Sequence, residues 1–319
     1  MMVRGKIMER KSLHIKIAHW YYNLGMTQDE IAKRLSFTRQ RVNRIISSLS
    51  ESGIVTIKVN GYEMSNVKYE TLIEEHFDLQ RVIIADSYGE SDKYLPSLAS
   101  VAAQYLDDYI QAKMTIGVSW GITLAETVSR LSFNKKSDCM VVQMVGAQNL
   151  DQDVLKSDEI ARALADKLDC ACYMLYAPVV VDQAATKTML MQEKSIKKSF
   201  EHIKRCDLGI FGIGQLSENS TMCKRGLLKT ADIKKLRDDG FIGDLCVNPI
   251  RSDGTWNDCY IKERVMTVDM EVLKEIPNVV AIAGGEDKTE AIIGCLKSQC
   301  INTLIIDDAT AKRIVEKLS

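Results

Sequence analysis

The chain has 319 residues, of which 46% are hydrophobic and 27% charged, and its formal net charge is −1. These values are ordinary for a soluble globular protein with one large domain and a small one, or with two medium ones. No apolar run is long enough to cross a membrane, and the nine cysteines include no C-x-x-C pair. We therefore expect free thiols in a reducing cytoplasm.

The near-zero net charge conceals an asymmetry. Residues 1–60 contain 11 Lys and Arg against 4 Asp and Glu, a net charge of +7, and the remaining residues contain 31 against 39, a net charge of −8. A basic head on an acidic body predicts that the head alone meets a polyanion.

A first helix is predicted over residues 13–24, because apolar side chains recur on one face of this stretch, namely Ile17, Trp20, Tyr21 and Leu24. Gly25 follows it, as a residue of left-handed conformation often follows a helix. We expect this helix to pack behind the next two and to complete a three-helix head.

Residues 27–49 predict two short helices joined by a tight turn. Thr27 and Glu30 have the spacing of a capping box, and Thr38 is a candidate N-cap for the second helix. The second helix has an inward apolar stripe at i, i+3, i+4 and i+7, formed by Val42, Ile45, Ile46 and Leu49.

The outward face of the second helix suits the major groove of DNA. Arg can bond guanine bidentately, Gln or Asn can bond adenine, and Ser or Thr suits phosphate contacts. A solvated helix hairpin is the alternative, but caps, stripe, turn and one-sided charge together favour a DNA-binding helix-turn-helix. The predicted DNA-binding residues are Thr27, Gln28, Thr38, Arg39, Gln40, Arg41, Asn43 and Arg44.

Residues 54–59 alternate and predict a strand, one arm of a small wing, and Asn60-Gly61 predicts a turn. We place the domain boundary there, which gives a helix-turn-helix domain at 1–60 and a second domain at 61–319.

Beyond residue 66, helix-like and strand-like segments alternate, which predicts an α/β fold with a Rossmann-like, mostly parallel sheet covered by helices. The predicted strands are 82–85, 114–118, 140–145, 172–176, 208–213, 279–283 and 303–306. The predicted helices are 67–77, 94–109, 122–131, 158–168, 194–204, 231–238, 287–296 and 309–318. Residues 243–260 break this rhythm, and residues 252–255 are expected to form the tip of a β-hairpin.

Glycine-bearing loops follow several of these strands, at the sheet edge where such folds bind ligands. In the loop of residues 117–123, two glycines let backbone amides approach an anion at a helix start. Lys288 is a point-charge partner for phosphate, and Asp244 can hold sugar hydroxyls. Each loop taken alone is consistent with an ordinary structural turn. We group the loops because all of them follow strands. The candidate ligand-binding residues are Gly117, Ser119, Trp120, Gly121, Ile122, Thr123, Gln143, Gly146, Gly212, Gly214, Asp244, Glu286 and Lys288.

Little acid–base machinery accompanies these loops. His76 and His202 fall outside the glycine loops, which leaves Asp244, Glu286 and Asp287 as possible bases. The loops match neither a dinucleotide nor an NTP fingerprint, and no catalytic triad or metal cluster is evident. No catalytic residue, cofactor or metal is therefore predicted.

In combination and order, the motifs resemble the SorC family of bacterial transcriptional regulators over about residues 13–318. They are Tyr21-Tyr22 before residues 26–32, the loop 117–123, Val142-Gln143 with Gly146, residues 211–214, Gly243-Asp244, residues 280–288 and residues 305–311. The resemblance implies a homotetramer whose second domain is similar to sugar-phosphate isomerases and binds a sugar-phosphate effector. It also implies that loop 117–123 and Lys288 hold phosphate, while Gln143 and Asp244 contact the sugar.

Two positions depart from the family pattern. Gly146-Ala147 stands where the family often has Gly-Gly, and Val145 stands where members that sense a deoxyribose phosphate have Lys. A Schiff base at this position is therefore not expected. The resemblance leaves phosphorylated sugars, sugar alcohols and a phosphorylated autoinducer as effectors of a carbohydrate-operon regulator. The alternatives are a sugar-phosphate isomerase-like enzyme with a DNA-binding head, and a DNA-binding scaffold whose second domain only oligomerises.

Overall fold

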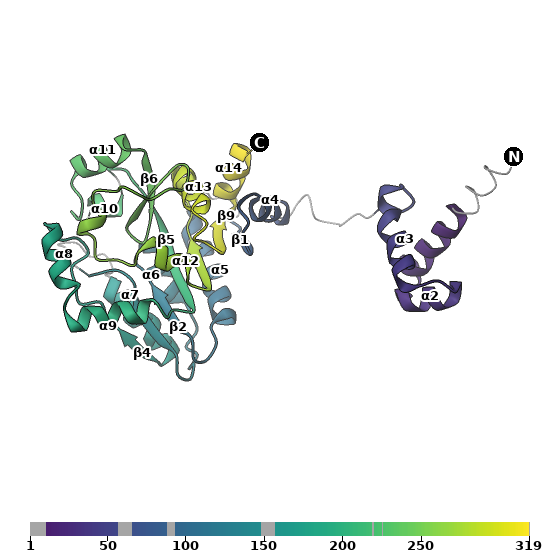
Figure 1. The fold of residues 1–319 in the computed structure, drawn as a ribbon, viewed down its shortest axis with the longest axis horizontal. Helices are drawn as coiled ribbons and strands as arrows, with labels where there is room; N and C mark the ends of the chain where they lie inside the picture. The colour runs from purple at the N-terminus through teal and green to yellow at the C-terminus, as the bar shows by residue number, and fades with distance from the viewer. Residues whose placement is uncertain are drawn as a thin grey trace. The chain divides into compact units, whose positions relative to one another are not determined.

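The computed structural model describes residues 11–56, 66–87, 93–147, 157–218, 220–224 and 226–318. The chain divides into two compact units, residues 1–64 and 65–319, called here the head and the body (Figure 1). In the predicted strand over 54–59, residues 54–56 have no strand structure, and the rest of it and Asn60-Gly61 lie outside the described residues.

Three helices form the head around a small apolar core. A helix over residues 11–18 continues as the π-helix η1 (His19–Asn23), and α2 (Gln28–Leu35) and α3 (Arg39–Glu51) follow. The predicted stripe of α3 is confirmed, since Val42, Ile46 and Leu49 are buried in this core and Ile45 packs against it. The prediction for Leu24 is wrong, because this side chain is 58% exposed. The i→i+5 bond from Leu24 N to His19 O widens the last turn and rotates Leu24 out of the inward stripe.

Side-chain caps fix both helices of the helix-turn-helix. Thr27 Oγ1 accepts a hydrogen bond from Glu30 N at 3.3 Å, and Glu30 Oε2 accepts one from Thr27 N at 2.8 Å, so the predicted capping box is confirmed. Thr38 Oγ1 accepts a hydrogen bond from Arg41 N at 3.2 Å and caps α3. These bonds satisfy amides that the helices themselves leave unpaired.

The body contains a mostly parallel sheet, as predicted. Its strands are β1 (Arg81–Ala85), β2 (Thr115–Val118), β3 (Met140–Gln143), β4 (Ala171–Tyr173), β5 (Leu208–Gln215), β6 (Phe241–Leu245), β7 (Asn248–Arg251), β8 (Asn278–Ile282) and β9 (Thr303–Asp307). The order is β1-β9-β8-β5-β2-β3-β4, with every neighbouring pair in this path parallel. The far end of β5 pairs antiparallel with β6, and β6 pairs antiparallel with β7.

Helices cover both faces of this sheet. The helices are α4 (Val67–Phe77), α5 (Tyr94–Tyr109), α6 (Ile122–Arg130), α7 (Ser157–Leu168), α8 (Ala184–Leu190), α9 (Lys194–Ile203), α10 (Thr221–Lys224), α11 (Thr230–Asp238), α12 (Met270–Lys274), α13 (Thr289–Lys297) and α14 (Asp308–Leu318). The short 3-10 helices η4 (Lys262–Arg264) and η5 (Glu286–Lys288) precede α12 and α13. Leu304 and Ile306 of β9 belong to one buried cluster with α4, α13 and α14, whereas Ile305 belongs to another with α5, α6 and α7. This alternation is the two-sided burial expected of a doubly wound sheet.

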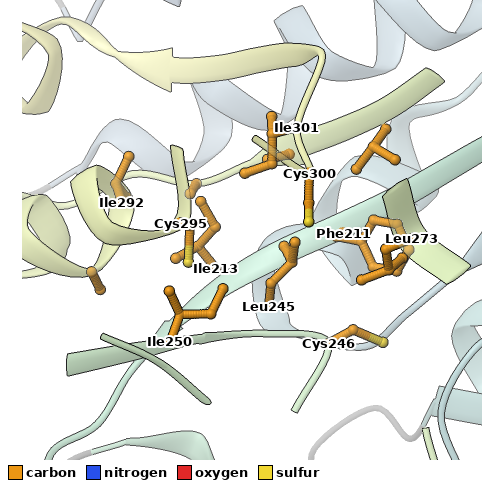
Figure 2. Close-up of a cluster of buried hydrophobic side chains, with 14 of the residues drawn as sticks. Phe211, Ile213, Leu245, Cys246, Ile250, Leu273, Ile292, Cys295, Cys300 and Ile301 are labelled. Atoms are coloured by element: carbon orange, nitrogen blue, oxygen red, sulfur yellow. The ribbon is translucent and has the colours of Figure 1, made fainter. Parts of the chain in front are cut away.

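The antiparallel extension is packed on α13. The buried cluster in Figure 2 brings Ile213 of β5, Leu245 of β6 and Ile250 of β7 together with Cys295 of α13. This packing fixes the end of β6, where Asp244 lies one residue before Leu245.

The hairpin prediction for residues 252–255 is wrong in its position. The tip lies at Cys246-Val247, between β6 and β7, and residues 252–255 form a separate tight turn after β7. Both tip residues have left-handed backbone, with φ of 52° and 63°. Asn and Gly usually occupy these two positions, so the sequence carries no turn signal there.

Replacement of Thr27 by Ala is expected to destabilise the head by about 1 kcal/mol, because it removes a side-chain cap of α2. Hydrogen exchange of the α2 amides measures this loss locally. Thr56→Ala is the matched control, since Thr56 is exposed and makes no side-chain hydrogen bond among the described residues. Equal protection of α2 in both variants would contradict the cap's contribution.

Candidate functional site

A cavity of about 140 Å³ opens at the carboxyl ends of β2 and β5. The sheet order reverses between these neighbouring strands, because the chain continues from β2 to β3 and β4 on one side and from β5 to β8 and β9 on the other. The loops after β2 and β5 therefore separate, and such a crevice is the usual ligand site of an open α/β sheet. The predicted residues that line it are Ser119, Trp120, Gly121, Ile122, Thr123, Gly212, Gly214, Asp244 and Lys288.

The loop after β2 presents the start of α6 to the cavity. Gly121 is the N-cap residue, and its φ of 139° is accessible to glycine but strained for other residues. The amides of Ile122, Thr123 and Leu124 donate to no acceptor in the described part of the chain. Unpaired amides at a helix start favour an anion.

Ser119 adds a buried hydroxyl to the same wall. Its side chain is 1% exposed, and Oγ forms no hydrogen bond of good geometry among the described residues, although it lies close enough to the Cys246 thiol to interact with it. Buried hydroxyls normally have a partner, so an unsatisfied one on a cavity wall fits a ligand acceptor at this place.

Asp244 faces the cavity from β6. Its Oδ2 accepts a hydrogen bond from Val247 N at 2.9 Å. Its Oδ1 lies against Gly214, where an added Cβ would come within 2.0 Å of that oxygen, so only glycine leaves room for the carboxylate. Burial raises the pKa of Asp244 to about 6, although the bond from Val247 and the charge of Lys288 act in the opposite direction.

Lys288 brings a positive charge to the same cavity from the loop after β8. Burial lowers its pKa, while the charges of Asp287, Asp244 and Asp307 raise it. No ion pair among the described residues involves Lys288. A largely buried ammonium without a direct partner favours an anionic ligand.

The loop that carries Lys288 is held on two sides. Gly285 has a φ of 102°, and its amide lies 3.0 Å from both Asp307 Oδ2 and Thr310 Oγ1, at the start of α14. Gln215 Nε2 donates to Asp287 Oδ2 at 2.7 Å, which ties η5 to the end of β5. These bonds fix the base of the Lys288 side chain before any ligand binds.

Four predicted residues do not line the cavity. Gln143 is buried on the neighbouring strand, where its amide donates to Val145 O at 2.7 Å and accepts from Leu175 N at 3.0 Å. Gly146 packs against Pro178 O, and Gly117 packs against Met144. Glu286 forms an ion pair with Arg313 of α14. β3 lies beside β2 on the side away from β5, between β2 and β4. The residues that follow β3 therefore turn toward the loop after β4 and not toward the cavity.

Sequence reasoning missed another part of the wall. The additional lining residues are Leu124, Ile213, Gln215, Ser220, Thr221, Met222 and Cys246. Ser220 to Met222 belong to the segment after β5, and none of these three residues is a glycine or carries a charge. Cys246 follows Asp244 by two residues, and a correct placement of the hairpin tip would have identified it.

The predicted DNA-binding residues lie on the two helices of the helix-turn-helix. Thr38, Arg39, Gln40, Arg41, Asn43 and Arg44 are exposed on α3 or at its N-cap. Gln28 Nε2 donates to Asn43 Oδ1 at 3.1 Å, and this bond joins α2 to α3. The Arg41 guanidinium lies 3.7 Å from the centre of the Phe37 ring, and Arg39 pairs with Asp29 at 3.6 Å.

No helix in the described ranges has the length and apolar character needed to cross a bilayer. Within the same ranges, no group of three or more His, Cys, Asp and Glu side chains is arranged to hold a metal ion.

Comparison with known families gives matches to both units. Residues 63–316 match the family described as "Putative sugar-binding domain", and residues 9–73 match the "Crp-like helix-turn-helix domain". The deoxyribonucleoside regulator of Bacillus subtilis is 25% identical over 311 residues, which cover 97% of this chain and 99% of the relative.

Solved structures agree with the sequence matches. A DeoR family transcriptional regulator from Listeria monocytogenes is 31% identical, with a TM-score of 0.73, over 78% of this chain and 99% of that one. The full-length sorbitol operon regulator SorC from Klebsiella pneumoniae has a TM-score of 0.74 at 24% identity, over 96% of this chain and 99% of that one. The second likeness covers the head as well as the body.

The raised pKa of Asp244 predicts a pH dependence of stability. Because the folded carboxyl has a pKa of about 6 rather than 3.8, its contribution is most favourable below pH 3.8 and is lost as pH rises through about 6. Asp244→Asn removes this titration. The stability of the variant relative to the wild type should therefore rise by about 2–3 kcal/mol between pH 4 and pH 7. Denaturant unfolding at both pH values measures it, and a constant difference would contradict the burial effect.

Proposed function

The chain belongs to the SorC family of transcriptional regulators, and we propose that a phosphorylated sugar or a similar phosphorylated metabolite controls its binding to the operator of a carbohydrate-related operon. The observation that carries this proposal is the cavity at the β2–β5 reversal. It brings together unpaired helix-start amides, a cation and a single buried carboxylate.

These groups suit the two ends of such a ligand. A phosphoryl group would accept hydrogen bonds from the amides at the start of α6 and from Ser119, and would pair with Lys288. The hydroxyl groups would donate to Asp244, whose Oδ1 has no hydrogen-bond donor among the described residues. An unphosphorylated sugar would leave the ammonium and the helix start unsatisfied, so phosphorylated ligands are favoured.

The head supplies the contact with DNA. Arg39, Gln40, Asn43 and Arg44 would read base edges in the major groove, while Thr27, Gln28, Thr38 and Arg41 would contact phosphates or support the reading helix. Residues 1–60 form the DNA-binding domain in this proposal, and residues 61–319 form the effector-binding and oligomerisation domain. The ligand alters operator affinity only by binding two conformations unequally, a coupling typically of about 1–3 kcal/mol.

The remaining parts of the proposal concern assembly, location and turnover. We infer a cytoplasmic homotetramer that needs no cofactor and binds its ligand without converting it. The raised pKa of Asp244 favours an isomerase-like alternative, because it suits a general base. No histidine lines the cavity, however, and aldose–ketose turnover by purified protein would support that alternative directly.

Replacement of Lys288 by Ala should weaken phosphate binding by about 1.5–3 kcal/mol, because it removes a charge-assisted bond. Calorimetric titration with inorganic phosphate, and with a panel of pentose and hexose phosphates, measures the loss. Lys312→Ala is the control, since Lys312 is exposed on α14 away from the cavity. Unchanged affinities in Lys288→Ala would show that the phosphoryl group binds elsewhere.

Replacement of Arg39 or Arg44 by Ala should cost about 1–3 kcal/mol each in operator affinity if each makes a bidentate base contact. A duplex recovered by selection from a random library provides the operator probe, and binding is measured at fixed salt concentration. Lys234→Ala in the body changes the charge equally and should bind as the wild type does. Wild-type affinity in both arginine variants would remove these residues from the reading surface.

A further inference from the structure

The tip of the β6–β7 hairpin has an unusual backbone. Leu245 pairs with Asn248, so Cys246 and Val247 alone form the turn. Both have positive φ, 52° and 63°, in the left-handed region. Val247 is branched at Cβ, and this conformation is a genuine outlier for a branched residue. The turn is therefore strained, and the surrounding structure must hold it.

Three polar side chains hold the turn. Asn248 Nδ2 donates to the carbonyl oxygens of Leu245 and Cys246 at 3.1 and 3.3 Å, and to Val268 O at 3.0 Å. Thr267 Oγ1 donates to Cys246 O at 2.7 Å. Asp244 Oδ2 accepts from Val247 N at 2.9 Å. All three side chains are buried, so bulk water does not compete for these hydrogen bonds.

The turn and the cavity share Asp244. One carboxylate oxygen accepts the amide of the strained residue, and the other lies beside Gly214 on the cavity wall. Cys246 lines the cavity itself, whereas Val247, Asn248 and Thr267 lie behind it, around a separate small void with Lys187 and Asp269. A left-handed Val247 is what brings its amide to Oδ2, because relaxation of the turn would redirect that N–H.

We propose that the Cys246-Val247 turn is a strained positioning element for effector recognition, in which Val247, Asn248 and Thr267 orient Asp244 toward the hydroxyl groups of a phosphorylated polyol without touching the ligand. This inference rests on the proposed function of the cavity and adds residues that determine its selectivity. The start of α6 and Lys288 follow other strands, and no hydrogen bond among the described residues joins them to the turn.

The contribution of the turn is measured by a ratio of two affinities, the affinity for a sugar phosphate divided by the affinity for inorganic phosphate. Only the first of these depends on hydroxyl groups that contact Asp244. The sugar probe is the member of a pentose and hexose phosphate panel that binds the wild-type protein most tightly. Asn248→Ala releases the turn and should lower the ratio about tenfold, the loss of roughly one hydrogen bond to a charged group, while inorganic phosphate binds as before. Thr267→Val, which retains the side-chain shape, should lower the ratio in the same direction if the first variant fails to fold.

A second substitution tests whether strain is the cause. Glycine adopts the left-handed conformation without strain, so Val247→Gly in the Asn248→Ala background should restore the ratio to within about threefold of wild type. Val247→Ala removes nearly as much side chain but stays strained, and should not restore it. Asn278→Ala, which removes another buried amide on β8 far from the turn, should leave both affinities unchanged.

The outcomes separate this inference from the proposed function. An unchanged ratio in Asn248→Ala and Thr267→Val, or equal rescue by Gly and Ala, would overturn the positioning role even if phosphate binds at Lys288. Equal binding of inorganic phosphate to the wild type and to Lys288→Ala would instead refute the cavity as the phosphate site. A proportional loss of both affinities in Asn248→Ala would indicate general damage to the body and would also overturn the positioning role.

Discussion

The reversal of strand order between β2 and β5 is the constraint on which the site depends. A parallel sheet buried on both faces offers a ligand only its edges and the ends of its strands. At this one boundary the following loops diverge, so a crevice forms without any loss of core packing. The same strand, β5, extends past the parallel sheet to pair with β6, and this extension brings Asp244 to the crevice. The reversal between β2 and β5 thus positions the start of α6, the glycines at the end of β5 and the buried Asp244 carboxylate.

The electrostatics of the crevice follow from its depth. Burial raises the pKa of Asp244 and lowers the pKa of Lys288, so both charged forms are disfavoured in the empty cavity. They also stabilise each other, because each moves the other's pKa back toward its ordinary value. An anion that arrives with its own hydroxyl donors satisfies both groups together, and neither group alone would select for a phosphorylated polyol over inorganic phosphate or over a free sugar.

Sequence periodicity was sufficient for the parallel sheet, but not for the β6–β7 extension, and only partly for the site. The helices over 67–77 and 94–109 were predicted at their observed ends, and each predicted strand of the body overlaps an observed one, because amphipathic helices have a period of 3.6 and strands buried on both faces are short apolar runs. Leu24 was misplaced because a π-turn leaves no mark on that pattern. The Cys246-Val247 tip was missed because tertiary bonds, rather than Asn or Gly, impose its conformation. Gln143 lies at the carboxyl end of a strand, as the residues that line the cavity lie at or after such ends, and only the strand order shows that it faces a neighbouring loop.

The strained turn is also relevant to how binding of a small ligand in the cavity can change the conformation of the body. A ligand shifts an equilibrium between conformations only by its unequal affinity for them, so the cavity must contain a group whose position differs between the two. The loops after β2 and β8 are less suitable, because hydrogen bonds tie each of them to a neighbouring strand or helix. The turn differs, since its backbone is held in an unfavourable region by a few hydrogen bonds, one of which ends on the carboxylate that lines the cavity. Behind it, Thr267 and Val268 bond to the backbone after β3, so a change in the turn would be transmitted first to residues 144–146, where a bridge joins Val145 to Thr267. The strained turn therefore also connects the cavity to a neighbouring loop of the body.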